Sequence, residues 1–282
     1  MGAIYGYLTN KIREGNQVIL VNIVPIKMRT TAIITGGSSG IGLGIAKGLA
    51  AAGYDLELIG LEENGSGIAA GLGQTYGVSV NFHPTDLTDA NAIEDFAAGI
   101  LRDHCPYILV NNAGIQHVSA IEDFAVEKWN AIIQINLTAA FLLTKAFFAS
   151  MKKQGSGRII NIASAHGLVA SEFKSAYVAS KHGLIGLSKV TALEGAPFGI
   201  TCNTICPGYV RTPLVDTQIK DQAKTHGISE QEVIEKVMLA KQPLKAFIST
   251  ESIAEMVVFL CRPEASCMTG SNISLDGGWT AQ

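Results

Sequence analysis

The sequence predicts an α/β fold in which helices cover both faces of one parallel, doubly wound sheet. Short β-branched runs alternate with longer helical patterns along most of the chain. The strand runs are continuously apolar, as strands buried on both faces must be. The 282 residues, 48% of them hydrophobic, are enough for one large core, and no repeat or linker divides them. We therefore expect a single domain of the doubly wound class.

The expected elements follow one another in order along the chain. The predicted strands are Thr31–Thr35, Leu56–Ile59, Val78–Phe82, Ile108–Val110, Arg158–Ile162, Ile200–Ile205 and Ile273–Leu275. The predicted helices are Ile41–Ala52, Ala90–Leu101, Val126–Met151, Ala176–Ala196 and Ser252–Leu260. Residues 212–250 are polar and helix-prone and follow a late strand, so we expect a helical lid over a cleft there.

The first 27 residues differ from the rest of the chain. Their apolar run, Val18–Ile26, superficially resembles a signal peptide, but Asn22 and Pro25 interrupt it and no small-residue cleavage site follows. The run is also too short to span a bilayer. We expect residues 1–27 to be an N-terminal extension of uncertain role, and residues 28–282 to form the working domain.

Composition limits the classes of partner. Twenty-one Lys and Arg against 24 Asp and Glu give a net charge of −3, and no segment concentrates positive charge. Neither a nucleic acid nor a membrane is therefore expected as a partner. The five cysteines form no Cys-x-x-Cys pair and the six histidines form no ligand cluster, so we expect no metal site and a reducing, cytoplasmic location. The expected partner is a small molecule.

The stretch "TGGSSGIG", Thr35–Gly42, follows the first predicted strand and opens the first predicted helix. Its glycines allow a tight turn and close approach of the backbone to a pyrophosphate, which the helix N-terminus attracts. A turn that merely connects two elements is the alternative. Three spaced glycines and two serines exceed what a connection requires, so the stretch indicates a Rossmann-type dinucleotide site.

The choice between NAD and NADP depends on the residues that follow the second strand. Between Lys47 and Arg102 there is no lysine or arginine, so no cation is available for a ribose 2′-phosphate. NAD is therefore favoured. The strand ends in "LIGLEE", with Gly60 and Leu61 where an aspartate often stands. Glu62 is a candidate for the ribose hydroxyls, and a solvated surface glutamate is the alternative.

The stretch "YVASK" places Tyr177 and Lys181 four residues apart, on one face of a helix. An ammonium beside a phenol favours the phenolate and lowers its pKa, so the tyrosine becomes able to act as an acid or base. Ser164 ends the preceding strand, and Asn136 is polar within an apolar helix. Singly each residue has a structural explanation; together they indicate a catalytic site.

With these residues in place, the chain resembles the short-chain dehydrogenase/reductase family from about Met28 to the C-terminus. The motifs that carry the resemblance are "TGGSSGIG", "DL" at 86–87, "NNAG" at 111–114, Asn136, Ser164, "YVASK" and "PGYVRTP" at 207–213. The resemblance implies hydride transfer between NAD and a secondary alcohol or ketone. It also implies a homotetramer, with the two long helices between subunits and the C-terminal "SLDGGWTAQ" reaching toward a neighbour.

The resemblance also implies a role for each matching residue. Tyr177 is the acid/base, Lys181 lowers its pKa and binds the nicotinamide ribose, Ser164 holds the substrate oxygen and Asn136 helps to hold a water in a proton relay. The residues expected at the cofactor are Thr35, Gly36, Ser38, Ser39, Gly40, Ile41, Gly42, Leu61, Asp86, Leu87, Asn112, Ala113, Gly114, Tyr177, Lys181, Pro207, Gly208, Val210 and Thr212.

The substrate depends on the polar residues around this site. Gln116, His166 and Lys174 offer an amide, an imidazole and a cation, which suit a small carboxylate. We expect Lys174, three residues before Tyr177, on the tyrosine's side of the helix. The alternatives are that Lys174 is a solvated helix residue and that His166 is an ordinary loop histidine. The stretches "NNAGIQHV", "NIASAHGLVAS", "FKSAYVASKHG" and "LDGGWTAQ" resemble the 3-hydroxybutyrate dehydrogenases. That resemblance adds Gln218 from the lid to Ser164 and Tyr177 at the substrate, and implies oxidation of (R)-3-hydroxybutyrate to acetoacetate.

One residue departs from that pattern, and two other functions stay open. Tyr209 stands where close relatives often carry tryptophan, which puts the packing of the lid in doubt. A related reductase of 3-oxoacyl thioesters, sugars or another small hydroxy acid has the same fold and chemistry. A non-catalytic NAD-binding scaffold is the alternative from a different class, although such proteins commonly lose the tyrosine or the lysine.

Overall fold

A computed structural model describes residues 30–212, 215–216, 219–220, 223–224 and 227–281, and the backbone of two short strands further toward the N-terminus. Those strands, β1 (Arg13–Glu14) and β2 (Gln17–Val18), form an antiparallel pair. Gln218 lies outside the described residues, as does most of the extension at 1–27. The predictions made for these parts of the chain therefore have no structural counterpart.

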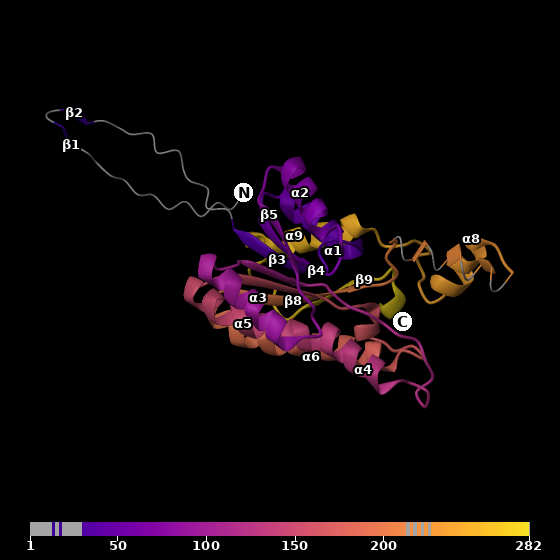
Figure 1. Cartoon of the computed structure of the whole chain (residues 1–282). Coiled ribbons are helices and arrows are strands. Elements are labelled where there is room, and N and C mark those ends of the chain that lie inside the picture. Colours follow the sequence, from indigo (N-terminus) through magenta and orange to yellow (C-terminus); the bar gives the residue numbers. More distant parts are fainter. Residues whose placement is uncertain are drawn as a thin grey trace.

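The centre of the described domain is a seven-stranded sheet in the order β5-β4-β3-β6-β7-β8-β9 (Figure 1). Every neighbouring pair in it is parallel. Its strands are β3 (Thr31–Thr35), β4 (Asp55–Gly60), β5 (Val80–Pro84), β6 (Ile108–Asn111), β7 (Gly157–Ile162), β8 (Ile200–Pro207) and β9 (Asn272–Leu275). The strand order reverses between β3 and β6, which creates the crevice where doubly wound folds bind ligands.

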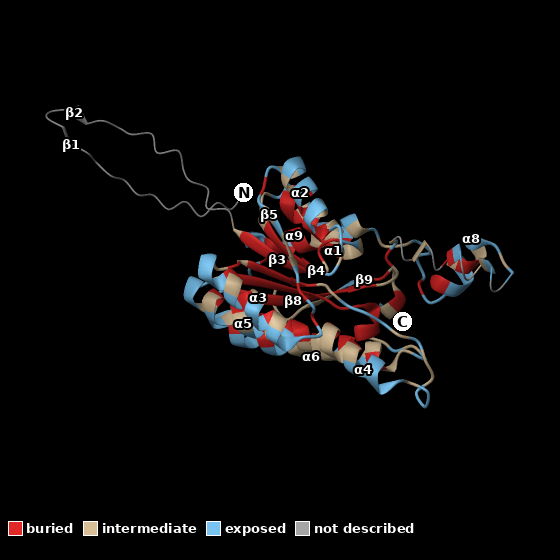
Figure 2. Cartoon of the chain, in the orientation of Figure 1, coloured by how far each residue is buried: buried red, intermediate tan, exposed pale blue. Residues whose placement is uncertain are grey.

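Helices cover both faces of the sheet, as Figure 2 shows by the buried strands between two helical layers. The helices are α1 (Gly40–Ala51), α2 (Gly65–Tyr76), α3 (Ala90–Asp103), α4 (Val126–Ile133), α5 (Ala139–Gln154), α6 (Ser175–Gly195), α8 (Glu230–Glu232) and α9 (Thr250–Cys261), with π-helical turns η1 (Gln134–Thr138) and η4 (Val233–Met238) and 3₁₀ turns η2 (Ala165–Gly167), η3 (Ala196–Phe198), η5 (Pro263–Ala265) and η6 (Trp279–Ala281). The predicted doubly wound fold is confirmed.

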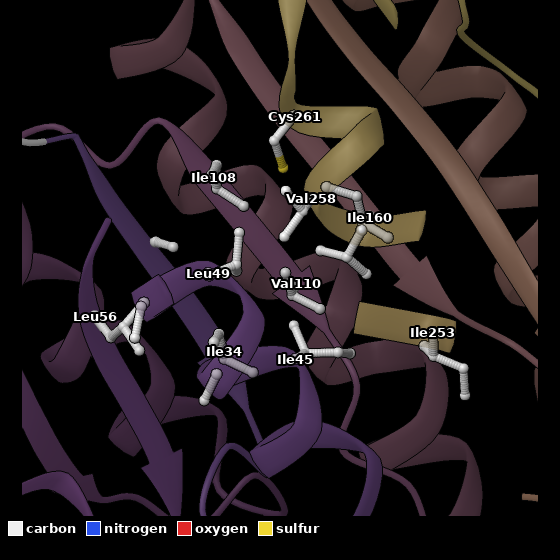
Figure 3. Close-up of a cluster of buried hydrophobic side chains, with 14 of the residues drawn as sticks. Ile34, Ile45, Leu49, Leu56, Ile108, Val110, Ile160, Ile253, Val258 and Cys261 are labelled. Atoms are coloured by element: carbon white, nitrogen blue, oxygen red, sulfur yellow. The ribbon is translucent and has the colours of Figure 1, made fainter. Parts of the chain in front are cut away.

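Two apolar clusters hold the layers together. On one face α1 and α9 pack on the strands, and Figure 3 shows Ile45, Leu49 and Val258 meeting Ile34 and Val110. On the other face α3 and α5 pack on β3, β6 and β7. Burying a large aliphatic side chain contributes about 1.5–3 kcal/mol before the loss of conformational entropy is counted. The two clusters therefore hold the carboxyl ends of the strands in a fixed frame.

The structure differs from the predicted elements in two helices. The prediction omitted α2, whose sequence "GSGIAAGLGQTY" contains four glycines and therefore has low helix propensity. The predicted helix Val126–Met151 is continuous to Gln154 but contains the π-helical turn η1. This stretch is long and apolar enough to cross a membrane by length and composition. Leu143, Phe147 and Met151 are nevertheless fully buried against the sheet, which is the packing of a core helix.

The described parts of the predicted lid form a small unit beyond the end of the sheet. A capping box at Ser229 begins α8, and η4 continues it. Ile219, Val233 and Met238 form a separate apolar cluster there, against which Tyr209 packs. A parallel bridge between Val210 and Ile248 joins the two ends of this unit beside β8. The lid is thus tied at its base to the strand that ends at the predicted nicotinamide site.

Candidate active site

The glycine turn lies at the carboxyl end of β3, where the strand order reverses. A Cβ on Gly42 would lie 1.9 Å from the Gly36 carbonyl oxygen, so that turn tolerates no side chain at this position. Gly36 and Gly40 have φ values of +61° and +48°, which favour glycine. A Cβ on Gly40 would meet only Thr212, at 3.7 Å, so space remains at the N-terminus of α1. This space fits a pyrophosphate held by backbone N–H groups.

The "NNAG" stretch holds that turn from the neighbouring strand. The backbone amides of Asn112 and Ala113 both donate to the Thr35 hydroxyl at 2.9 Å. The Asn112 side chain donates to the carbonyls of Thr35, at 2.9 Å, and Gly36, at 3.3 Å. A Cβ on Gly114 would lie 3.4 Å from the Lys181 ammonium nitrogen. The predicted cofactor residues of β3 and β6 are therefore brought together with the lysine.

Glu62 reaches back from the end of β4 to the glycine turn. Its carboxylate accepts hydrogen bonds from the hydroxyls of Ser38, at 2.5 Å, and Ser39, at 2.8 Å. Partial burial raises the pKa of Glu62, but these hydroxyls and nearby backbone amides outweigh that effect and hold the pKa below its ordinary value. The Leu61 side chain is 66% exposed. An ionised carboxylate therefore lies beside the glycine turn, just after the end of β4.

The other predicted cofactor residues surround the same crevice. The Asp86 carboxylate accepts hydrogen bonds from the amide and the hydroxyl of Thr88, which hold its pKa below the ordinary value. Leu87 is buried against the α3 layer. Pro207 ends β8, Gly208 follows it, and Val210 forms the bridge to the base of the lid. The residues predicted for the adenine side thus follow β5 and those predicted for the nicotinamide end follow β8, on opposite sides of the point where the strand order reverses.

Asn136 lies inside the π-helical turn η1 and is almost fully buried. Its side chain exchanges two hydrogen bonds with the backbone of Ile115, at 2.8 and 2.9 Å, and donates to the Ser180 hydroxyl at 3.1 Å. Ser180 in turn donates to the Tyr177 carbonyl at 2.8 Å. Asn136 therefore connects the loop after β6 to the helix that carries the tyrosine. The π turn is where a helix commonly adapts to a functional residue.

Lys181 is buried beneath Tyr177, on the same face of α6. Its ammonium donates to the Ile162 carbonyl at 2.8 Å and lies 5.7 Å from the centre of the Tyr177 ring. Burial lowers its pKa to about 8. The predicted spacing on one helical face is thus confirmed, and Lys181 is positioned by the strand end that precedes Ser164.

Burial dominates the pKa of Tyr177, contrary to the prediction that the lysine lowers it. Desolvation raises the pKa of this phenol, a hydrogen bond with Ser164 lowers it, and Tyr209 raises it. The Lys181 ammonium donates to the Ile162 carbonyl and not to the phenol oxygen. In the chain alone the phenol is therefore the stable form. The predicted shift requires a rearranged lysine or additional positive charge near the ring.

His166 and Trp279 form the wall beside this tyrosine. The His166 ring lies 5.9 Å from the Tyr177 ring and 5.0 Å from Trp279, edge-on in both cases, and Trp279 stacks on Tyr209 at 5.9 Å. The His166 amide donates to the Ser164 hydroxyl at 3.1 Å. Desolvation, helped by the positive charge of Lys174 and Lys241, lowers the pKa of His166 to about 4. This imidazole is neutral at pH 7.

Lys174 is the N-cap residue directly before α6, three residues before Tyr177. It is half-buried, and burial followed by the charge of Lys241 lowers its pKa. Gln116 lies in an exposed stretch after β6, and among the described residues no hydrogen bond joins it to His166 or Lys174. The structure brings His166 to the predicted acid/base Tyr177, and Lys174 lies close enough to lower the pKa of that imidazole.

Sequence reasoning missed three residues at this site: Ser180, Gln242 and Trp279. Ser180 joins Asn136 to α6. Gln242 is buried, and its amide donates to the carbonyls of Leu244 and Ala246. The only sequence signal for Gln242 was a polar residue before a proline. Its side chain also packs against Gly208 and Gly277, which lie more than thirty residues away on either side, so local pattern carried no information about those contacts. Within the part of the chain that the structure describes, no group of His, Cys, Asp and Glu is placed to hold a metal ion.

Comparisons with known proteins agree with this geometry. A protein-family model described as short chain dehydrogenase matches residues 30–223. A D-beta-hydroxybutyrate dehydrogenase of Rhizobium meliloti is 50% identical, over 90% of this chain and 100% of its own length. One of Cupriavidus necator is 47% identical, over 89% of this chain and 98% of its own length. L-sorbose reductase from Gluconobacter frateurii, solved with NADPH and L-sorbose, superposes with a TM-score of 0.86 at 30% identity, over 90% of this chain and 97% of that one.

The family uses NAD or NADP as its hydride carrier, and the residues around the glycine turn and Lys181 fit such a cofactor. The matched region contains the turn, the "NNAG" stretch, and all four residues predicted to be catalytic. The relatives extend the match over nearly their full lengths. The chain belongs to the short-chain dehydrogenase family.

Proposed function

We propose that this chain oxidises (R)-3-hydroxybutyrate to acetoacetate with NAD⁺, and catalyses the reverse reaction. The observation that carries the proposal is the imidazole of His166. It is 5% exposed beside Ser164, and its Nε2 has no hydrogen-bond partner among the described residues. Because buried polar atoms are rarely left unpaired, a ligand group is expected at this nitrogen. The two relatives named as D-beta-hydroxybutyrate dehydrogenases support a small hydroxy acid as that ligand.

The charge at this site suits a carboxylate. With its pKa near 4, His166 is neutral at pH 7 and can offer an N–H from Nε2 when Nδ1 faces the Ser164 hydroxyl, 3.5 Å away. Lys174 supplies the positive charge from the start of α6. Hydrogen bonds between ionised partners are about twice as strong as neutral ones. An acid is therefore held in preference to its ester, with its hydroxyl directed toward Ser164 and Tyr177.

The chemistry then follows from the positions of three side chains. Ser164 donates to and orients the substrate oxygen, and the Tyr177 oxygen takes the hydroxyl proton as the C–H bond of the same carbon breaks. Bound NAD⁺ supplies the hydride acceptor. Since burial raises the pKa of Tyr177, the tyrosinate needs a nearby cation. We assign this role to Lys181, whose ammonium would turn from the Ile162 carbonyl toward the phenol when the cofactor is bound.

We propose NAD rather than NADP because of Glu62. Its carboxylate is ionised beside Ser38 and Ser39 and stands at the end of β4, where the adenosine ribose lies in this class of fold. A ribose 2′-hydroxyl can donate to a carboxylate, whereas a 2′-phosphate is repelled by it. No lysine or arginine stands between Lys47 and Arg102 to offset that repulsion.

We further propose a homotetrameric, cytoplasmic enzyme. The outer faces of α5 and α6 and the turn after α6 expose the large apolar side chains Phe141, Val190, Leu193 and Phe198. Leu193 is 78% exposed, which favours burial against another subunit. All five cysteines are free thiols, in keeping with a reducing compartment.

The test is the absorbance of NADH formed from NAD⁺ and each enantiomer of 3-hydroxybutyrate, with the methyl ester and NADP⁺ as controls. We expect turnover of the (R)-acid with NAD⁺, and little with the ester. The variant Tyr177→Phe should lose turnover while binding NADH normally, which separates loss of the acid/base from misfolding.

Two results would overturn the proposal. Equal turnover of acid and ester would mean that the enzyme does not recognise the substrate's carboxylate, and would indicate a ketone or sugar reductase. Binding of NADH without turnover of any alcohol or ketone in a broad panel would indicate a non-catalytic scaffold.

A further inference from the structure

Residues 242–246, which lead from the lid back to the sheet, are held beside the active site by the side chain of Gln242. The buried side chain of Gln242 donates to two carbonyls of this segment, those of Leu244 and Ala246. It also fills the space above two glycines: a Cβ on Gly208 would lie 2.8 Å from Gln242 Oε1, and a Cβ on Gly277 would lie 2.6 Å from its Nε2. The residue before Gln242 therefore has a fixed position beside the turn after β8.

That residue is Lys241, and its side chain crosses to the substrate side of the site. Its ammonium donates to the Ser171 hydroxyl at 3.2 Å. Ser171 lies within residues 166–174, which begin with the buried imidazole of His166 and end with Lys174; we refer to them as the carboxylate loop. Lys241 thus joins the base of the lid to the loop that is proposed to hold the substrate's acid group.

Lys241 gives this region a net positive charge. The carboxylate loop carries one acidic side chain, Glu172, which is exposed, and one lysine, Lys174. His166 is neutral at pH 7, so the loop alone has no net charge. Lys241 adds one positive charge. Its field reaches both His166 and Lys174, lowering the pKa of each. An anion that enters between these groups therefore meets a net positive field.

We propose that Lys241 is a specificity-determining residue that, together with Lys174, draws the substrate's carboxylate into the site. The inference rests on the proposed function and extends it to a residue outside the catalytic four. Because Lys241 is exposed, its contribution acts through a field that salt screens. A charge at the rim of a site changes capture of the ligand more than the bond-making step.

The experiment compares Lys241→Gln with the control variant Lys236→Gln. Lys236 lies in η4 and forms an ion pair with Glu232 within the lid. Turnover of (R)-3-hydroxybutyrate and of its methyl ester is measured at low and high salt. We expect Lys241→Gln to raise KM for the acid about five- to tenfold at low salt, with kcat and the Kd for NADH within about twofold. High salt should remove most of the difference, and the ester should respond little. Lys236→Gln should behave as wild type.

Three outcomes would overturn the inference. One is a KM for the acid that is the same in Lys241→Gln as in the Lys236→Gln control. Another is an equal loss for acid and ester, because that result indicates a structural role. The third is a wild-type enzyme that does not prefer acids to esters, and only this result also removes the proposed function. Ser171→Ala, which keeps the charge and removes its hydrogen bond, should retain the salt dependence.

Discussion

The imidazole of His166 shows how its surroundings decide the charge of a side chain. A histidine in the unfolded chain titrates near pH 6.5, whereas burial and nearby lysines lower the pKa of His166 to about 4. The neutral form is therefore the one that the fold stabilises. Protonation favours the unfolded chain as soon as the pH falls below 6.5.

The first prediction follows from that shift. The contribution of His166 to stability is complete above pH 6.5 and is lost as the pH falls toward 4, by about 3 kcal/mol in total. Urea denaturation of the wild type and of His166→Gln at pH 7, 5.5 and 4.5 isolates this contribution, because other groups titrate in both proteins. The difference in free energy of unfolding between the two proteins should shrink toward acid. A constant difference would contradict the burial of a neutral imidazole.

A second prediction at the scale of single residues concerns Glu62. Glu62→Gln keeps the shape of the side chain but removes its charge beside Ser38 and Ser39. We expect the ratio of kcat/KM for NAD to that for NADP to fall about tenfold, chiefly because NADP is no longer repelled. The exposed neighbour Glu63 provides the matched control as Glu63→Gln. An unchanged ratio in Glu62→Gln would mean that Glu62 only holds the glycine turn and does not select the cofactor.

At the scale of elements, β4 contains a charge that its pattern does not predict. Glu57 is 5% exposed within a strand of apolar residues, and its carboxylate lies 2.6 Å from His83 Nε2 on β5 and 3.7 Å from His104 Nε2 after α3. Asn81 donates to it at 3.1 Å. A buried carboxylate is tolerated only with such partners. The edge of the sheet is therefore held by polar contacts as well as by its apolar face.

A prediction at this scale tests that pair. His83→Val leaves Glu57 with its weaker partners and should lower the free energy of unfolding by about 2 kcal/mol, less than for a wholly buried pair because His83 is a third exposed. Replacing both residues, as Glu57→Val with His83→Val, should recover most of that loss, since two apolar side chains need no partner. Chemical denaturation of the single and double variants measures both values. A double variant less stable than the single one would contradict the pairing.

The local sequence pattern was sufficient to predict the strands but not all of the helices. Each predicted strand is present. Short, continuous β-branched runs are typical of strands that are buried on both faces of a parallel sheet. The helix α2 was missed because its glycines lower helix propensity, and its stability comes from packing on the first apolar cluster. The π turn at Asn136 was invisible for a related reason, because Ile115 and Ser180 hold that side chain from other elements.

At the scale of the whole molecule, the start of the domain at Met28 stays a prediction. The apolar clusters of the described residues include nothing before Ala32. Two relatives match about nine-tenths of this chain with nearly all of their own length. On this match we propose that residues 28–282 form the domain.

The corresponding prediction is that a chain that begins at Met28 keeps its assembly and activity. Light scattering should give a tetramer for both the full and the shortened chain, with kcat/KM and melting temperature nearly equal, because no described core contact is removed. A monomer in both cases would contradict the proposed assembly. A tetramer that is lost only on shortening would give the first 27 residues a role in the interface.

The sequence by itself determined the fold class, the glycine turn and the four candidate catalytic residues, because strand and helix periodicity and the steric needs of a tight turn are local properties. The tertiary structure decided the charges and partners at the site. Burial has the largest effect on the pKa of Tyr177, and burial together with Lys174 and Lys241 lowers the pKa of His166. Desolvation and electrostatic fields depend on which distant residues surround a group, and no spacing within one segment contains that information.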